Sequence, residues 1–438
     1  MPGPRPRELR AGAVRCFRVI GPTSNPMTTA APTLDDRGLA RGLARAERSA
    51  KLRAVALTLP LLLFLLATFV GPIAALLTKS VVDTDVPRIL PRVTAALRDW
   101  DGRDLPPEPA WRALAEDIRA ARAEGTLASA ATRLNYDVTG YRSLLFGTGR
   151  GLPEAIEGSA REAFIAIDPK WGEIETWGAL KRAGGPVTDF YLLAAADLKR
   201  DAAGDIAREK DDEVIFRMIL GRTLWIAGVV MLVCLLLGYP TAWYLSQQTD
   251  RKAALLLFLV LLPFWTSLLV RTVAWVVLLQ REGVVNDALL RSGLIAEPLK
   301  MIFNRFAVYV AMVHVLLPFM ILPLYSVMKS IPPSYVRAAA SLGAPPLVAW
   351  LRVYVPQTLP GIGAGCLMVF IQALGYYVTP ALVGGADDQM ISYFIAFYAS
   401  KTINWGMAAA LALILLAATM ALYTVYQRLV GFDRMRLA

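Results

Sequence analysis

The sequence predicts an all-α polytopic membrane protein, with about six transmembrane helices and a large, mainly helical insertion on the outer side of the membrane. The chain has 438 residues, of which 56% are hydrophobic and only 18% are charged. The apolar residues are gathered in blocks of about 20, the length that a helix needs to cross the hydrocarbon core. The charged residues lie between these blocks, and a soluble chain of this length would carry more of them.

Six apolar stretches are long enough to span a bilayer as helices. A helix is favoured in lipid because it satisfies its own backbone hydrogen bonds, and neighbouring groups there tolerate the prolines that several stretches contain. The expected spans are 54–77, 219–245, 253–279, 304–328, 359–383 and 405–428.

Lys and Arg in the short loops predict the orientation of these helices. With the N-terminus inside, the outer side receives residues 80–217, 280–303 and 384–404, although 280–303 also holds basic residues. Six helices place both termini in the cytoplasm. The net charge of +11 reflects this positive-inside bias and gives no argument for nucleic-acid binding. The basic residues assigned to the inner side are Arg251, Lys252, Lys329, Arg337, Arg352, Arg434 and Arg436.

The N-terminal segment 1–53 is basic and precedes the first expected span. Residues 1–26 are dominated by Pro, Arg and Gly and lack the apolar core of a signal peptide. We therefore expect the natural chain to start at Met27. Residues 35–53 are expected to form a basic, partly helical lead-in at the inner surface.

The insertion, residues 80–217, is too long for a simple loop and is net acidic. Residues 108–123 place Trp111, Leu114, Ile118 and Ala121 on one helical face, which predicts an amphipathic helix. A second helix is expected at 194–210. The carboxylates form either an ordinary solvated surface or a surface that attracts a cationic solute, and no catalytic constellation is found among them.

The expected cytoplasmic loop 329–361 is longer than a simple connection between two spans needs, and its sequence predicts two short helices. Pro332 and Pro333 followed by Ser334 indicate a helix start, and the alanines that follow favour helix and leave a small-residue surface. Gly343 suits a reversal that needs a left-handed backbone or a close approach, and Pro345 and Pro346 lie at the start of a second short helix. Such a helix–turn–helix is suited to dock in a groove of a soluble partner.

This loop resembles the EAA loop of ABC importer permeases, in which a coupling helix seats in the ATPase subunit. Ala338 and Ala339 match its two alanines, Gly343 matches its glycine, and Pro356, Pro360 and Gly361 match its proline-rich return into the membrane. Arg337 stands where the family usually has Glu, so the charge at this position is reversed. The residues expected to couple to the ATPase are Arg337, Ala338, Ala339, Gly343, Ala344, Pro356, Pro360 and Gly361, within 331–361.

The flanking segments resemble the spermidine/putrescine-type permeases, over 219–438 and less closely over 54–77. They include LVLLPFWTSLLVRTVAW at 259–275 and FIQALGYYVTPALVGG at 370–385. The resemblance implies a bacterial inner-membrane permease with a periplasmic binding protein, two ATPase subunits and a second, homologous permease subunit. It does not account for 80–217. An ABC permease for an opine, an amino-acid derivative, ferric ion or sulfate remains an alternative, and a membrane-anchored sensor or scaffold is a distant one.

The chain encodes no phosphate-binding loop of its own. A Walker loop needs glycine directly before its Lys-Ser/Thr pair. The three such pairs, at 79–80, 329–330 and 401–402, follow Thr78, Met328 and Ser400. We therefore expect a non-enzymatic subunit without a cofactor, with ATP and Mg²⁺ bound by partner chains.

A solute path or gate is expected among polar and aromatic residues in or near the spans. Charges in lipid are costly and are functional candidates, whereas an Arg that snorkels to the headgroups is the alternative. Aromatic faces attract cations but also mark membrane interfaces. His314 is expected to be packed and non-catalytic, and Cys16, Cys234 and Cys366 suit neither a disulfide framework nor a metal site. The candidates are Arg271, Trp265, Trp275, Tyr376, Tyr377, Asp387 and Asp388.

Overall fold

The computed structural model describes residues 36–200, 205–208 and 214–430. It divides into two compact units, Met1–Val70 and Gly71–Ala438, which are treated separately. The expectation that the natural chain starts at Met27 lies outside the described residues, as does Cys16.

The described part of the first unit is a single helical path. Helix α1 (Asp36–Leu65) continues into one π-helical turn, η1 (Leu66–Val70). This confirms a helical lead-in before the first span. The apolar helical segment Lys51–Thr78 is long enough to cross a membrane, in agreement with the predicted span 54–77.

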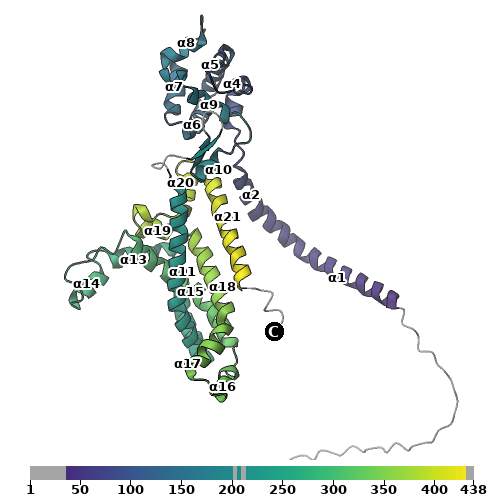
Figure 1. The fold of residues 1–438 in the computed structure, drawn as a ribbon, viewed down its shortest axis with the longest axis vertical. Coiled ribbons are helices and arrows are strands. Elements are labelled where there is room, and N and C mark those ends of the chain that lie inside the picture. Colours follow the sequence, from purple (N-terminus) through teal and green to yellow (C-terminus); the bar gives the residue numbers. More distant parts are fainter. Residues whose placement is uncertain (1–35, 201–204, 209–213, 431–438) are drawn as a thin grey trace, which may run out of the picture. The chain divides into compact units, whose positions relative to one another are not determined.

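The second unit opens with α2 (Gly71–Thr78), followed by the insertion, which is mainly helical as predicted. Eight α-helices and one 3-10 turn make up most of the insertion (Figure 1). They are α3 (Asp85–Ile89), α4 (Pro91–Ala96), α5 (Glu108–Ala123), α6 (Leu127–Asp137), α7 (Tyr141–Gly151), α8 (Ala160–Ile167), η2 (Pro169–Gly172), α9 (Ile174–Arg182) and α10 (Phe190–Ala195).

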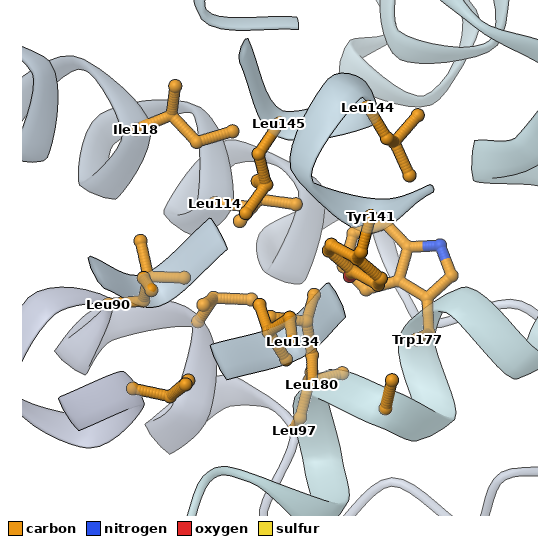
Figure 2. Packing of buried hydrophobic residues seen from close by; sticks show 14 of the residues in the cluster. Leu90, Leu97, Leu114, Ile118, Leu134, Tyr141, Leu144, Leu145, Trp177 and Leu180 are labelled. Carbon is orange, nitrogen blue, oxygen red and sulfur yellow. The ribbon is translucent and has the colours of Figure 1, made fainter. Parts of the chain in front are cut away.

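The insertion has its own apolar core, which resembles that of a soluble domain. Trp111, Trp171 and Trp177 are fully buried in it, and their rings meet edge-on or tilted, with Trp111 and Trp177 centroids 4.4 Å apart. Figure 2 shows leucines from several helices converging beside Tyr141 and Trp177. Helix α5 has the predicted bounds and buries the four residues expected on its apolar face.

The predicted helix at 194–210 is wrong. Helix α10 ends at Ala195, and the chain then forms an antiparallel pair of short strands, β1 (Leu198–Arg200) and β2 (Ile206–Arg208). Asp197 adopts a left-handed backbone with φ of 56°, which breaks the helical path before β1. Its carboxylate then accepts hydrogen bonds from the backbone N–H groups of Ile215, Phe216 and Arg217 at the start of the next helix.

Three long helices form the centre of the permease part: α11 (Phe216–Ser246), α15 (Arg305–Ser330) and α18 (Val355–Gly375). Small residues let them approach closely, as is common between helices in membranes. A Cβ on Gly238 or Gly365 would lie only 2.8 Å or 2.7 Å from side-chain atoms of Met320. The side chains buried between these helices form the second apolar core.

The predicted span 253–279 is broken in the structure, because the chain bends there by 93°. Helix α12 (Asp250–Leu261) passes through a 3-10 turn, η3 (Leu262–Trp265), before α13 (Leu268–Leu279) begins. Pro263 cannot donate a backbone hydrogen bond, and Thr266 is extended, so the helix cannot continue. A short helix, α14 (Val284–Arg291), follows.

The predicted span 359–383 is also divided. Helix α18 ends at Gly375, and the chain restarts as α19 (Val378–Val383) after the extended Tyr376. A 3-10 turn, η5 (Ala386–Asp388), and the helices α20 (Ile391–Ser400) and α21 (Trp405–Val430) complete this part. Within the described residues, five helices are long and apolar enough to span a membrane, or six if the bent pair counts as one span.

The insertion contacts the permease part where α20 leads into α21. Helix α10 packs against α21 (Figure 1), and a Cβ on Gly406 would collide with the Tyr191 ring. The Tyr136 hydroxyl lies 3.5 Å from the Thr402 carbonyl oxygen. A glycine at the start of α21 therefore makes room for the insertion.

Candidate functional site

The predicted coupling loop begins as expected, with α16 (Ser334–Ser341) directly after Pro332 and Pro333. At its end, the Gly343 N–H donates to the Ala340 carbonyl and the Ala344 N–H donates to the Ala339 carbonyl. This is the hydrogen-bond pattern of a Schellman motif. Gly343 has φ of 84°, and a Cβ there would meet no atom within 4 Å. Gly343 is therefore needed for its left-handed backbone conformation and not for close packing against another segment.

The loop presents apolar and small side chains to its surroundings. Tyr335, Leu342 and Leu347 are 50%, 89% and 67% exposed. Arg337, Ala338 and Ala340 are exposed, Ala339 and Ala344 are half-buried, and no side chain of α16 is buried. Arg337 makes no ion pair with any residue that the structure describes. The side chains of α16, which follows α15, therefore remain accessible in the described chain.

The predicted return into the membrane needs correction. Pro356, Pro360 and Gly361 do not end the loop, because they lie inside α18. The second short helix, α17 (Pro346–Ala349), passes through a π-helical segment, η4 (Trp350–Tyr354), directly into α18. Proline is tolerated in the first turn of a helix, so Pro356 fits its place. The predicted coupling loop therefore leads through α17 and η4 into α18 without a break in the helical backbone.

Gly361 has a packing role in this helix. A Cβ on it would lie 3.0 Å from the Val327 Cβ and 3.2 Å from the Pro323 carbonyl oxygen on α15. Gly363 and Gly365 are equally enclosed, by Tyr426 and Met320. These two were missed from the sequence, although the spacing of small residues at 361, 363 and 365 is a signal of close helix packing.

Three of the predicted path residues come together with His314. The Trp275 indole N–H donates to His314 Nδ1 at 3.0 Å. Arg271 lies within electrostatic range of His314 and Tyr376, and its Nε and Nη1 atoms are buried without a hydrogen-bond partner among the described residues. His314 is half-buried and packed, as expected. This cluster joins α13, α15 and the break after α18.

The remaining aromatic candidates lie apart from this cluster. Trp265 is 68% exposed and its ring lies 4.8 Å from that of Phe258. Tyr377 is 44% exposed. Both side chains face outward from the described chain, where aromatic residues of membrane proteins also meet lipid or partners.

The two predicted aspartates have different surroundings. Asp388 is 6% exposed, its Oδ1 pairs with Arg305 Nε at 2.9 Å, and its Oδ2 accepts from the Gly385 N–H. Asp387 is exposed. Asp388 thus holds the connection between α19 and α15 together, and only Asp387 has a carboxylate available to a cation.

The comparisons with known proteins agree with this architecture. Residues 218–432 match the family model "Binding-protein-dependent transport system inner membrane component". The spermidine/putrescine transport system permease protein PotB of Escherichia coli is 36% identical over 217 residues, which are 50% of this chain and 78% of that protein. PotB of Haemophilus influenzae is 36% identical over 55% of this chain and 87% of that protein.

A third relative carries a more general description. The inner membrane ABC transporter permease protein YdcU of Escherichia coli is 34% identical over 49% of this chain and 72% of that protein. The family match begins only after the insertion, at residue 218. The insertion therefore lies outside the part of the chain that this family model describes.

Proposed function

This chain belongs to the family of binding-protein-dependent transport system inner membrane components and is a permease subunit of an ABC importer, and we propose that its solute is a polyamine such as putrescine or spermidine. The proposal is carried by the 36% identity to spermidine/putrescine permeases over most of their length. A periplasmic binding protein delivers the solute to the outer face of the permease.

Helix α16 is the element that we assign to coupling. Its exposed face, with Leu342 at its end, suits a groove in an ATPase subunit, because helices dock through apolar anchors of this kind. Since α16 follows α15 and leads through α17 into α18, movement of the ATPase pair reaches two of the three central helices directly. ATP and Mg²⁺ are bound by the two ATPase subunits, and docking must favour one orientation of the permease over the other.

The cluster of Arg271, Trp275, His314 and Tyr376 is assigned to the gate of the solute path. A guanidinium and a polyamine are both positively charged, so Arg271 repels a polyamine that rests beside it. The aromatic faces of Trp275 and Tyr376 attract the same cation. Exposed Asp387 adds a carboxylate near the expected outer end of the path. Repulsion by Arg271 together with attraction by the aromatic rings and Asp387 suits a path through which a cation passes without being bound tightly.

The apolar surface of α12 and α13 is assigned to a second, homologous permease subunit and to lipid. Leu255, Trp265 and Val270 are each more than 60% exposed. Both termini are assigned to the cytoplasm, which places α16 on the ATPase side and the insertion in the periplasm. An importer for an opine, an amino-acid derivative, ferric ion or sulfate would share this architecture, because the family fold does not specify the solute.

Uptake of labelled putrescine and spermidine in the native host, with and without this gene, tests the proposal. We expect deletion to abolish high-affinity uptake of at least one polyamine and the wild-type gene to restore it. Competition by unlabelled opines, amino acids, ferric ion and sulfate then examines the alternatives. Unchanged uptake of both polyamines on deletion would contradict the polyamine assignment and leave the family membership untouched.

A further inference from the structure

Large apolar side chains are exposed on the insertion only at the end where it joins the membrane spans. Within the described residues 79–200, 205–208 and 214–215, four such side chains are exposed, and every other one is buried or half-buried. We call these four residues the foot of the insertion. They are Val82, Val187, Ile206 and Ile215, which are 39%, 71%, 58% and 48% exposed.

The foot lies close to the level where three spans reach the side of the membrane that carries the insertion. The helices long and apolar enough to span end at Thr78, begin at Phe216 and begin at Trp405. The turn after Thr78 stays helical, because the Val82 N–H donates to the Thr78 carbonyl at 2.8 Å. Val82 therefore lies about 6 Å beyond the end of that span. The headgroup region on each side of the hydrocarbon core is about 5–8 Å thick.

Val187 is held at the same level as Val82, although the two are far apart in the sequence. They face each other in an isolated antiparallel bridge, and the Thr188 N–H donates to the Val81 carbonyl at 2.8 Å. The bridge ties the segment before α10 to the turn that leaves the first span. Two strongly apolar side chains are thereby fixed beside the headgroup region.

The other two residues of the foot are tied to the start of α11. The Ile215 N–H donates to the Asp197 carboxylate at 3.1 Å, and β1 begins directly after Asp197. Ile206 lies on β2, opposite Arg200 of β1. The foot therefore consists of three separate segments that are each anchored where a span begins or ends.

The exposed apolar surface continues from the foot along α11. Met218, Trp225 and Leu232 are 60%, 64% and 51% exposed, and their spacing of seven residues places them on one face of the helix. Exposed Lys79 and Arg217 lie beside the foot, and basic side chains at the ends of spans reach the headgroups. The foot thus extends a surface that suits contact with lipid.

The foot does not form one flat face. Val82 lines a crevice together with Lys79 and Trp405, whereas Val187 lines a separate crevice with Phe216. A protein that docks from one side covers one such face, while lipid reaches every open side of the junction. We propose that the foot lies in the headgroup region of the bilayer, where its apolar side chains contact phospholipid.

Contact with the bilayer gives the insertion a fixed orientation. Apolar groups that enter the boundary between headgroups and acyl chains bind there in proportion to the area that they bury. Together with the Asp197 carboxylate, which caps α11, and Tyr191, which packs at Gly406, the foot holds the insertion against the membrane. This inference does not depend on the transported solute or on coupling to an ATPase.

Spin labels on the full-length chain in phospholipid nanodiscs test the proposal. Each label is attached to a single introduced cysteine after the three native cysteines are replaced by Ser. Collisions of the label with O₂, which concentrates among acyl chains, are compared with collisions with a water-soluble nickel chelate. We expect the ratio of O₂ to nickel collisions in Val82→Cys and Val187→Cys to be at least about threefold that in Ala155→Cys, because the foot reaches the headgroup boundary. Ala155 is exposed between α7 and α8 and serves as the control in water.

Leu232→Cys, in the middle of α11, gives the ratio for full contact with acyl chains. Values for both foot positions between those of Ala155→Cys and Leu232→Cys support the proposal. Ratios equal to that of Ala155→Cys would show that the foot is in water, and a raised ratio at only one position would show that the foot as a whole is not in the headgroup region. Low collision rates with both reagents would show that protein covers the foot. Each of these three results would overturn the proposal.

Discussion

The helices α14 and α16 are each eight residues long and end with the same hydrogen-bond pattern, yet their surroundings differ. At the end of α14 the Gly293 N–H donates to Leu290 and the Leu294 N–H donates to Leu289, the same Schellman pattern as at Gly343. Gly293 has φ of 73° and, like Gly343, open space around its Cβ position. One helix precedes α15 and the other follows it, and the 26 residues of α15 span about 39 Å.

The difference between them lies in what is buried. Asn286 of α14 is fully buried, donates to the carbonyls of Gln280 and Leu299, and accepts from the Leu299 N–H. It fixes α14 to its own loop. Helix α16, by contrast, buries no side chain. The same local stop signal therefore ends a helix that is fixed to its own loop in one place and a helix without a buried side chain in the other.

The largest expected effect comes from Gly343→Val, compared with Gly293→Val. A β-branched residue at positive φ is strained by about 1–2 kcal/mol at either site. We expect Gly343→Val to reduce uptake of the transported solute at least tenfold, because the end of α16 is displaced, while Gly293→Val retains most uptake. Cellular uptake, normalised to the amount of protein in the membrane, is the measurement. Equal losses would mean that α14 and α16 are equivalent.

Leu342→Asp should have the next largest effect, with Leu294→Asp as its control. Both leucines are strongly exposed, at 89% and 74%, so neither change should alter folding by more than about 0.5 kcal/mol. A charge in an apolar docking groove is costly. We therefore expect ATPase subunits to co-purify about tenfold less with Leu342→Asp and normally with Leu294→Asp. Undiminished co-purification with Leu342→Asp would remove this residue from the interface.

The smallest effect is expected from Arg337→Glu, compared with Arg291→Glu on α14. Arg337 is exposed, and reversing its charge restores the residue that the resembling loops usually carry. We expect association with the chain's own ATPase to fall about threefold, because charges that face each other across an interface are opposite in sign. A rise in association would instead show that Arg337 weakens the natural contact. Arg291→Glu should leave association unchanged.

The features predicted correctly are those with a local cause. The 3.6-residue spacing of Trp111, Leu114 and Ile118 specifies α5 because that helix has one wet and one dry face. The prolines before Ser334 and the glycine at 343 mark the bounds of α16, since each restricts or frees the backbone itself. Those signals predicted the geometry of the docking element, while its docking function stays a prediction.

The incorrect predictions concern segments whose local sequence permits two outcomes. Residues 253–279 are mainly apolar, with Arg271 as their only charged residue, so their pattern does not distinguish a straight helix from the 93° bend. Residues 194–210 have helical composition, but Asp197 adopts a left-handed backbone and its carboxylate caps α11. The proximity of Arg271 to His314 and Tyr376 depends on the two helix breaks, so spacing along the chain could not reveal it.

By itself, the sequence determined that this protein is a helical membrane protein, where most of its spans begin and where the short helix α16 starts and stops, because hydrophobic length and backbone restrictions act within a few turns. The permease family was indicated by resemblance to known sequences. Only the tertiary structure decided where two of the spans break, how glycines 238, 361 and 365 set the spacing of the central helices, and that Val82 pairs with Val187 beside the end of a span. These features depend on packing between residues far apart in the chain, and side chains pack only where the fold has already brought their backbones together.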